Sequence, residues 1–413
     1  EFPDADMQDI HLDDAYTLKA ADMVMNSGGV NIQPLGVEIP VISLKNYLNQ
    51  YSYGAFRTHT SFYPKNDAGT TISYTSKKPR TYYMKKTASN PDGYTPDQQA
   101  SREEELLEEV LQAVKPSIEK ELSGAQLDTN NDGFIDAVSF MVEGKFSDSG
   151  IGWNDLLWSH KADRIFSTTI SGKTVGAYNL NNVGDSQSPG GVFSYRVDKT
   201  QAAPLDTLKL NRAGYSVIHH EFLHTLGLPD LYRGTSIGEP VGFYDIMASN
   251  NSQNPQAMLS VLSHDWLGWG SKLSEITDDR QITIQRPKYQ DSNEVISYKI
   301  YSPFHDKEYF VVEYYQKQDA THNTGRDNGL IVYRVNSTLY TNMGGTTDGL
   351  GDFLYVFRPE ETSLGAAAGN LKDAVILPTV GNTYGKTIDE TGDTWDKDTL
   401  YYSNGKNSGI KLE

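Results

Sequence analysis

Cysteine is absent from all 413 positions of the chain. This absence excludes disulfide bonds, thiolate metal ligands and a cysteine nucleophile. It leaves the compartment open, because many secreted bacterial proteins also lack cysteine. Apolar runs long enough to cross a bilayer, about 18 residues, are missing too, so we expect no membrane span. The chain opens with residues 1–4 (EFPD) and shows no signal peptide. We therefore interpret it as a processed chain whose targeting segment is missing.

Positive charge is scarce. The chain has 36 lysine and arginine residues against 54 aspartate and glutamate residues, which gives a net charge of −18. An acidic surface repels phosphate groups, so we expect no nucleic acid among the partners, and anionic membranes are disfavoured for the same reason. Carboxylates are instead the ligands that hard cations such as calcium prefer.

The length of the sequence and the change from helical to β-rich segments along it predict two domains of an α+β protein. A chain of 413 residues exceeds what one hydrophobic core usually serves. Helical periodicity is clearest over residues 101–122, where Pro116 is expected to kink or end the helix, and it returns over 213–226. After about residue 272 the apolar segments are β-rich and separated by turns. We therefore predict one domain over 1–272 and an all-β, sandwich-like domain over 273–413.

Several short apolar segments predict individual strands. In the first domain these are residues 134–142 and 156–159. In the second domain they are residues 282–284, 295–301, 308–315, 329–335 and 353–357.

Histidine is rare, yet three of the nine histidines lie within residues 219–224. Helix positions i and i+4 share a face, so His220 and His224 point the same way and can hold one zinc ion. Glu221 can stand beside the open coordination position and take a proton from the metal-bound water, as in the H-E-x-x-H motif. His219 is rotated about 100° from His220 around the helix, so we expect a hydrogen-bonded neighbour and not a ligand.

A third ligand is expected just after this helix. Gly227 can adopt the left-handed conformation that ends a helix, and Pro229 prevents the helix from resuming. A short reversal can then bring the carboxylate of Asp230 back to the metal, with water in the fourth position. The alternative is a core helix with chance histidines, but the spacing of Gly227 and Asp230 favours the metal site.

Residues 128–136 (DTNNDGFID) follow the first three-quarters of an EF-hand-like calcium loop. The predicted ligands are the side chains of Asp128, Asn130, Asp132 and Asp136 and the carbonyl group of Phe134. Gly133 allows the sharp turn. Ser139 stands where the bidentate glutamate of an EF-hand would be, and a strand-like segment follows, so we predict an isolated structural calcium loop. The alternative is a solvated turn of aspartate and asparagine.

The segment around His220 resembles the extended zinc motif H-E-x-x-H-x-x-G-x-x-H/D of the metzincins. This resemblance implies a methionine in a tight turn beneath the metal. Residues 242–249 (GFYDIMAS) fit that turn, with Met247 as the methionine. The alternative for Met247 is an ordinary core methionine.

Most of the chain resembles the bacterial immune inhibitor A-type metallopeptidases, a branch of the metzincins. The resemblance is strongest at residues 220–232 (HEFLHTLGLPDLY) and includes residues 1–4, 47–56, 157–160, 245–247, 267–269, 308–314 and 329–335. It implies a metzincin-like catalytic domain with a twisted sheet, a backing helix, an active-site helix and a Met-turn, followed by β-strands. It also implies a secreted, extracellular bacterial zinc endopeptidase made as a precursor with an N-terminal propeptide, which is not visible here.

One position departs from the metzincin pattern. Several metzincins have a tyrosine two residues after the turn methionine that can stabilise the oxyanion, whereas this chain has Ser249. Tyr232 and Tyr244 are candidates by proximity, although core packing is the expected role of each. For His160 a structural hydrogen bond is the expected role.

These observations favour zinc-dependent hydrolysis of peptide bonds in protein or peptide substrates, with a zinc-activated water and Glu221 as general base. Two other functions remain open. An exopeptidase would need an anchor for a substrate terminus, and we identify none in the sequence. A catalytically silent surface-binding protein on the same scaffold would not need Glu221.

Overall fold

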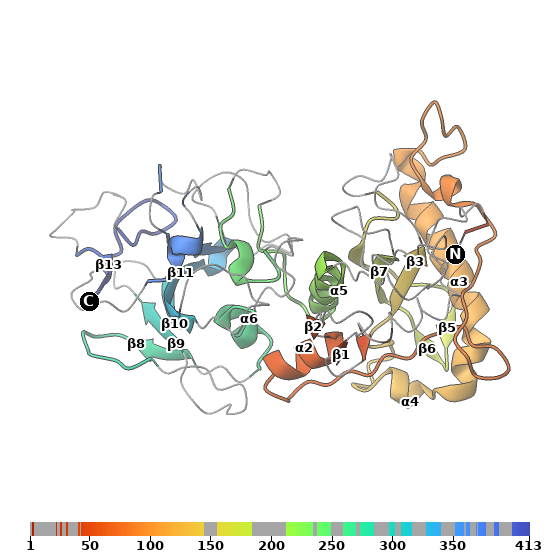
Figure 1. Ribbon diagram of the computed structural model, residues 1–413, viewed down its shortest axis with the longest axis horizontal. Coiled ribbons are helices and arrows are strands. Elements are labelled where there is room, and N and C mark those ends of the chain that lie inside the picture. The colour runs from red at the N-terminus through yellow and green to blue at the C-terminus, as the bar shows by residue number, and fades with distance from the viewer. Residues whose placement is uncertain are drawn as a thin grey trace. The chain divides into compact units, whose positions relative to one another are not determined.

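We describe the protein from a computed structural model, shown in Figure 1. The described residues are 2–3, 22, 25–26, 30–31, 40–41, 43–143, 155–183, 212–233, 238–248, 259–269, 273–284, 297–301, 307–315, 328–339, 352–358, 361–363, 369, 371–376, 384–387 and 399–413. The chain forms two compact units, Glu1–Tyr47 with Thr58–Leu226 and Leu48–Arg57 with Gly227–Glu413. The change from helix-containing to β-rich sequence near residue 272 therefore does not coincide with this division. A domain boundary there stays a prediction.

The first unit is built around a mixed three-stranded sheet in the order β3-β7-β4. The central strand is β7 (Ala177–Val183), which runs parallel to β3 (Ser139–Glu143) and antiparallel to β4 (His160–Asp163). Side chains alternate between the two faces of a strand. The two faces of β7 can therefore pack against different helices.

Two helices lie on opposite faces of this sheet (Figure 1). Tyr178 and Leu180 of β7 belong to the hydrophobic core that includes the apolar face of α3 (Gln99–Glu121). Asn179, on the other face, donates its side-chain amide to Thr225 Oγ1 at 3.0 Å. Thr225 is the last residue of α5 (Arg212–Thr225), so the metal-motif helix lies on the face opposite the α3 core.

Helix α3 differs from its prediction at Pro116. The helix was expected to kink or end there, but it continues through Pro116 to Glu121. Proline removes only one backbone N–H from the helix. Val114 is buried and Ile118 packs against the core, so tertiary contacts hold both neighbouring turns in place.

Two predicted strands of the first unit lie elsewhere. Residues 156–158 form a turn in which Leu156 and Leu157 are buried, and β4 begins only at His160. Burial of apolar side chains therefore does not require a strand here. Strand β3 begins at Ser139 instead of residue 134, because residues 128–136 form a loop. The other elements of this part of the chain are β1 Val30–Asn31, β2 Pro40–Val41, α2 Leu44–Tyr51, η1 Arg80–Tyr83, η2 Pro96–Gln98, α4 Gly124–Leu127, β5 Thr169–Ile170 and β6 Lys173–Thr174.

The second unit contains a five-stranded sheet in the order β12-β11-β10-β9-β8. Its strands are β8 Leu273–Ile276, β9 Ser297–Tyr301, β10 Glu308–Tyr315, β11 Gly329–Asn336 and β12 Leu354–Val356. Neighbouring strands are antiparallel except β8 and β9, which are parallel. The predicted strands at 308–315 and 329–335 are confirmed almost to the residue, whereas residues 282–284 are not in a strand.

The central strand β10 buries both of its faces. Phe310 and Val312 pack in a core with Tyr401. On the other face, Tyr315 makes an edge-on ring contact with Tyr244, with 5.6 Å between ring centroids. The remaining elements of this unit are η3 Gly242–Tyr244, α6 Val261–Trp266, η4 Ser337–Leu339, η5 Leu371–Ala374, β13 Tyr384–Gly385 and β14 Lys411–Leu412.

The predicted α+β class is confirmed at the level of small sheets combined with a few helices. The described strands after residue 272 give the five-stranded sheet and the β13–β14 pair, and they do not establish a sandwich. The metzincin-like details of the catalytic domain also stay predictions. Among the helices that the structure describes, none is long and apolar enough to cross a membrane.

Candidate metal centre

Helix α5 places the two histidines of the motif one turn apart. His220 is buried and His224 is partly exposed, so the shared face opens toward solvent at its second histidine. The helix ends at Thr225, and Gly227 follows with φ of 98°. This left-handed conformation costs a glycine little and turns the chain away from the helix axis, as the sequence predicted.

His220, His224 and Asp230 come together. The Nε2 atoms of the two imidazoles are 3.1 Å apart, and their rings are perpendicular with centroids 4.7 Å apart. One ligand atom from each of the three residues lies within 4.8 Å of the others. Among the described residues, these three form the one group of three or more His, Asp or Glu ligands that meets this criterion.

This donor set fits a zinc ion. Zinc binds imidazole nitrogen at about 2.0–2.1 Å and carboxylate oxygen at about 2.0–2.2 Å, so two nitrogens 3.1 Å apart can share one ion. Without a cation between them, two imidazole nitrogens this close must have one donor and one acceptor. Three protein ligands are also the number that catalytic zinc sites use, whereas structural sites use four.

The chain around Asp230 is tied to the predicted Met-turn. The N–H of Leu231 donates to the carbonyl oxygen of Met247 at 2.8 Å, and Met247 is completely buried. The residue after the third metal-ligand candidate is therefore held by the backbone of the methionine. This contact supports a positioning role for the turn.

Asp245 organises the segment of the predicted Met-turn, and sequence reasoning missed this role. Its Oδ1 accepts the N–H of Met247 at 2.8 Å, which is an Asx turn. Its Oδ2 accepts the N–H of Ser260 at 3.0 Å and the hydroxyl groups of Ser260 and Ser263 at 2.7 and 2.5 Å. Burial raises the pKa of Asp245 in spite of these four donors. An aspartate two residues before the methionine was the local signal for the Asx turn.

His160, Glu103 and Tyr178 form a polar cluster in the first unit. The Nε2 atom of His160 is 2.9 Å from Glu103 Oε1, and the hydroxyl group of Tyr178 donates to the same oxygen. Burial by itself would lower the pKa of His160, but the hydrogen bond and charge of Glu103 raise it, with a further contribution from the charge of Glu221. The hydrogen-bonding role expected for His160 therefore agrees with this geometry, and its partner is Glu103.

His219 does not join the metal group. Its ring stacks on Tyr47 of α2, with 4.7 Å between centroids and 28° between the ring planes. The side chain is fully buried, and burial lowers its pKa to about 3. The imidazole is therefore neutral near pH 7 and packs as an aromatic side chain.

The two tyrosines considered for the oxyanion differ in their surroundings. The hydroxyl group of Tyr244 donates to the carbonyl oxygen of Leu371 at 2.7 Å, so Tyr244 has the packing role expected for it. Tyr232 is partly exposed, and its role stays open. Ser249, which replaces the tyrosine of other metzincins, lies outside the described residues.

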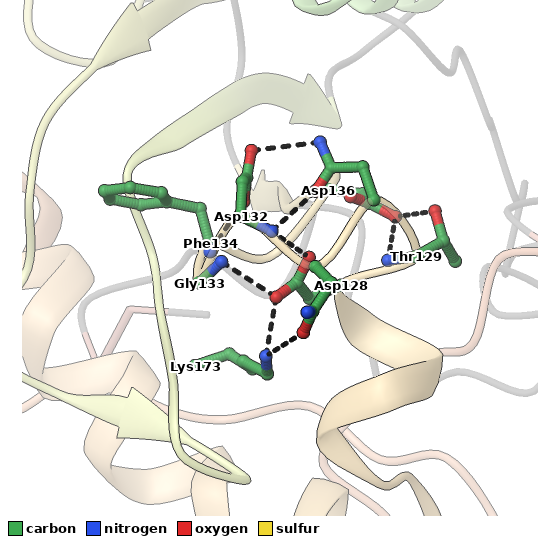
Figure 2. Close-up of polar contacts among 9 residues, drawn as sticks. Asp128, Thr129, Asp132, Gly133, Phe134, Asp136 and Lys173 are labelled. Carbon is green, nitrogen blue, oxygen red and sulfur yellow. Dashed lines mark hydrogen bonds and ion pairs between the residues drawn. The ribbon is translucent and has the colours of Figure 1, made fainter.

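The predicted calcium loop is held by hydrogen bonds within the protein (Figure 2). The carboxylate of Asp128 accepts the N–H groups of Asp132 and Gly133 at 3.1 and 2.9 Å, and it also accepts the Lys173 ammonium at 2.6 Å. Asp136 Oδ2 accepts the N–H and the hydroxyl group of Thr129 at 2.9 and 2.5 Å.

The three loop carboxylates do not gather into a metal-binding group of the kind formed around His220. The side chain of Asn130 donates to Asp132 Oδ2 at 2.9 Å, and Phe134 donates its N–H to Asp132 Oδ1 at 2.8 Å. The structure therefore gives the calcium prediction no support.

Comparison with known proteins identifies the family. A family model described as the immune inhibitor A peptidase M6 catalytic domain matches residues 22–256, more than half of the chain. No curated protein matches. Among solved structures, wild-type OgpA from Akkermansia muciniphila aligns over 71% of this chain and 76% of its own, with 12% identity and a TM-score of 0.27.

The family match spans the metal group, Glu221 and Met247 in one continuous segment. The chain belongs to the immune inhibitor A family of peptidases, the M6 family, and is a metallopeptidase.

Proposed function

We propose that this metallopeptidase is a secreted zinc endopeptidase that cleaves proteins or peptides at internal bonds. The observation that carries the proposal is the group of His220, His224 and Asp230 beside Glu221. Two imidazoles and one carboxylate are a ligand set that suits zinc, and an acid next to the first histidine suits hydrolysis. The secreted location and the use of zinc follow the family resemblance.

Within this proposal His220, His224 and Asp230 hold the zinc ion. Met247 belongs to the supporting turn, because its carbonyl oxygen fixes Leu231 next to Asp230. Bound zinc supplies Lewis acidity, which polarises a carbonyl group and lowers the pKa of a coordinated water toward about 7.

Glu221 is the general base. It accepts a proton from the attacking water and then delivers that proton to the leaving amine. Its side chain is only 7% exposed, so its charge acts in a partly desolvated setting where electrostatic interactions are stronger than in bulk water. A protein that only bound its target would not need a base at this position.

The proposed catalytic domain covers residues 1–272, and the β-rich part covers 273–413. The ring contact between Tyr244 and Tyr315 shows that the two sequence regions share packing around the Met-turn segment. We therefore propose that the β-rich part stabilises the Met-turn segment.

The decisive test combines metal analysis with cleavage of peptides blocked at both ends. We expect about one zinc per chain, lost in His220→Ala and His224→Ala, and cleavage of doubly blocked peptides that stops in a zinc chelator and returns with added zinc. Cleavage restricted to peptides with a free terminus would support the exopeptidase. Bound zinc without cleavage of any library peptide would support a silent binding protein.

A further inference from the structure

The loop of residues 128–136 has most of the sequence of a cation-binding loop, but one expected ligand is missing and another contacts a different partner. A calcium ion takes 6–8 oxygen ligands at about 2.3–2.6 Å, usually including a bidentate acid at position 12. Position 12 is Ser139, which lies in β3 and pairs with Asn179 of β7. The acid at position 9, Asp136, is turned to the backbone and side chain of Thr129.

A second strand brings a positive charge to this loop. The N–H of Thr174 donates to the carbonyl oxygen of Gly133 at 3.0 Å, and the N–H of Ile135 donates to the carbonyl oxygen of Thr174 at 2.8 Å. These two backbone bonds fix β6 against the loop. The backbone position of Lys173, the residue before Thr174, is therefore fixed.

The ammonium group of Lys173 reaches the first acid of the loop. Its Nζ atom lies 2.6 Å from Asp128 Oδ2, a contact drawn in Figure 2. The same atom lies 3.5 Å from the side-chain oxygen of Asn131. The Asp128 side chain is fully buried, and that of Lys173 is 20% exposed. The hydrogen bond from Lys173 is the largest influence on the pKa of Asp128 and lowers it below its ordinary value.

The neighbouring turn adds further ties. Ser171 donates its N–H to Glu119 at 2.7 Å and its hydroxyl group to the carbonyl oxygen of Leu122 at 2.7 Å. The hairpin that contains Lys173 is thus hydrogen-bonded to the end of α3 as well as to the loop. These hydrogen bonds fix the position of the ammonium group against the loop.

We propose that the Lys173 ammonium is the resident cation of this loop and that the loop folds without calcium. A buried carboxylate needs a positive partner, and Lys173 supplies it from β6. The loop then ties the end of α4 to β6 by one ion pair and two backbone bonds.

The test compares Lys173→Met with Lys161→Met in the full zinc-loaded chain. Lys161 also pairs with an aspartate, Asp163 at 2.5 Å, but that aspartate is exposed. In calcium-free buffer we expect Lys173→Met to lower Tm by roughly 2–4 °C or more, and Lys161→Met to change it little. Lys173→Arg, which keeps the charge, should restore most of the loss. Equal Tm values for the wild type and Lys173→Met would overturn the proposal.

A metal titration gives the second readout. Terbium luminescence and calcium calorimetry on the wild type and on Asp128→Asn should show no difference in binding, because the loop holds no metal. Saturable binding of one calcium per chain that disappears in Asp128→Asn would overturn the proposal, even if Lys173→Met failed to fold. Zinc content and peptide cleavage are recorded in parallel, so a failure of the proposed zinc chemistry is seen separately.

Discussion

Arg233 and Asp352 meet as a two-pronged ion pair although 119 residues separate them. Arg233 Nε donates to Asp352 Oδ1 at 2.8 Å and Nη2 donates to Oδ2 at 2.5 Å, and both side chains are 1% exposed. The guanidinium matches the carboxylate geometrically, which makes such pairs the most directional ionic contacts in proteins. Arg233 follows Asp230 by three residues, so this pair anchors the segment that bears the third metal-ligand candidate.

Removal of either partner should destabilise the protein strongly. Arg233→Met leaves a buried carboxylate without its partner, a change that typically costs about 3–5 kcal/mol. We expect a large fall in Tm and weaker retention of zinc in a chelator competition, since the chain next to Asp230 loses its anchor. The double variant Arg233→Met/Asp352→Leu should regain part of the stability.

The control is Arg280→Met, which removes an arginine from an exposed pair with Asp278. Exposed pairs contribute about 0–1 kcal/mol, so this variant should behave almost like the wild type. If Arg233→Met and Arg280→Met had the same Tm and the same zinc retention, the anchoring role would be wrong.

Glu221→Gln should separate metal binding from catalysis. The amide keeps the size of the side chain but cannot accept a proton, so zinc content should stay near one per chain while cleavage falls by about 10²–10⁴-fold or more. Glu105→Gln makes the same chemical change on the exposed surface of α3 and should leave both quantities unchanged. Cleavage at wild-type rate by Glu221→Gln would remove Glu221 from the mechanism.

The His160–Glu103 pair should make stability depend on pH. The pKa of His160 is raised in the folded protein, so the stabilisation is fully present below the unfolded value of about 6.5 and is lost as pH rises through the higher folded value. Glu103 on α3 and Tyr178 on β7 contact this imidazole, and the charge of Glu221 on α5 also raises its pKa.

We therefore expect His160→Gln to lower Tm more at pH 6 than at pH 8.5. His59→Gln replaces an exposed histidine and should show no such difference. The measurement is a thermal melt of all three proteins across this range. A Tm deficit for His160→Gln that stayed constant, or grew toward high pH, would contradict the assignment.

Loss of the contact between Tyr315 and Tyr244 should destabilise the proposed metal centre, although Tyr315 lies in the β-rich region. Tyr315→Ala removes a buried ring that faces the Met-turn segment, and buried aromatic truncations cost about 3–5 kcal/mol. We expect a lower Tm together with weaker zinc retention. Tyr314→Ala, at the next position on β10 and partly exposed, should have the smaller effect on both. A larger loss in Tyr314→Ala would show that this face of the sheet does not support the turn.

The grouping of His220, His224 and Asp230 was largely predictable because these residues are close in sequence. Helical spacing places His220 and His224 on one face, and the left-handed Gly227 permits the reversal before Asp230. Helix α5 and the hairpin of β10 and β11 were found within a residue or two of their predicted ends. The support given by Asp245 was missed, because three of its four hydrogen bonds come from Ser260 and Ser263, well beyond the turn.

Local pattern was insufficient where distant residues or packing contribute. The loop at 128–136 has the composition of a calcium site, but its contact with Lys173 could not be predicted, because Lys173 lies 45 residues from Asp128 and no periodicity links them. Pro116 was expected to kink or end a helix, yet packing of the neighbouring turns lets the helix continue to Glu121. Residues 156–159 are apolar enough for a strand, but the structure has a turn there, in which Leu156 and Leu157 are buried.

Short-range spacing accounts for the candidate site: which side chains can hold a metal, which acid stands next to them, and where the helix that carries them ends. These properties depend on spacings of a few residues, which backbone geometry fixes locally. Long-range folding, in contrast, selects the partners of the buried acids Asp128, Glu103 and Asp352. Their partners come from other elements of the chain, and the cost of burying an unpaired charge selects those pairs only once the chain has folded.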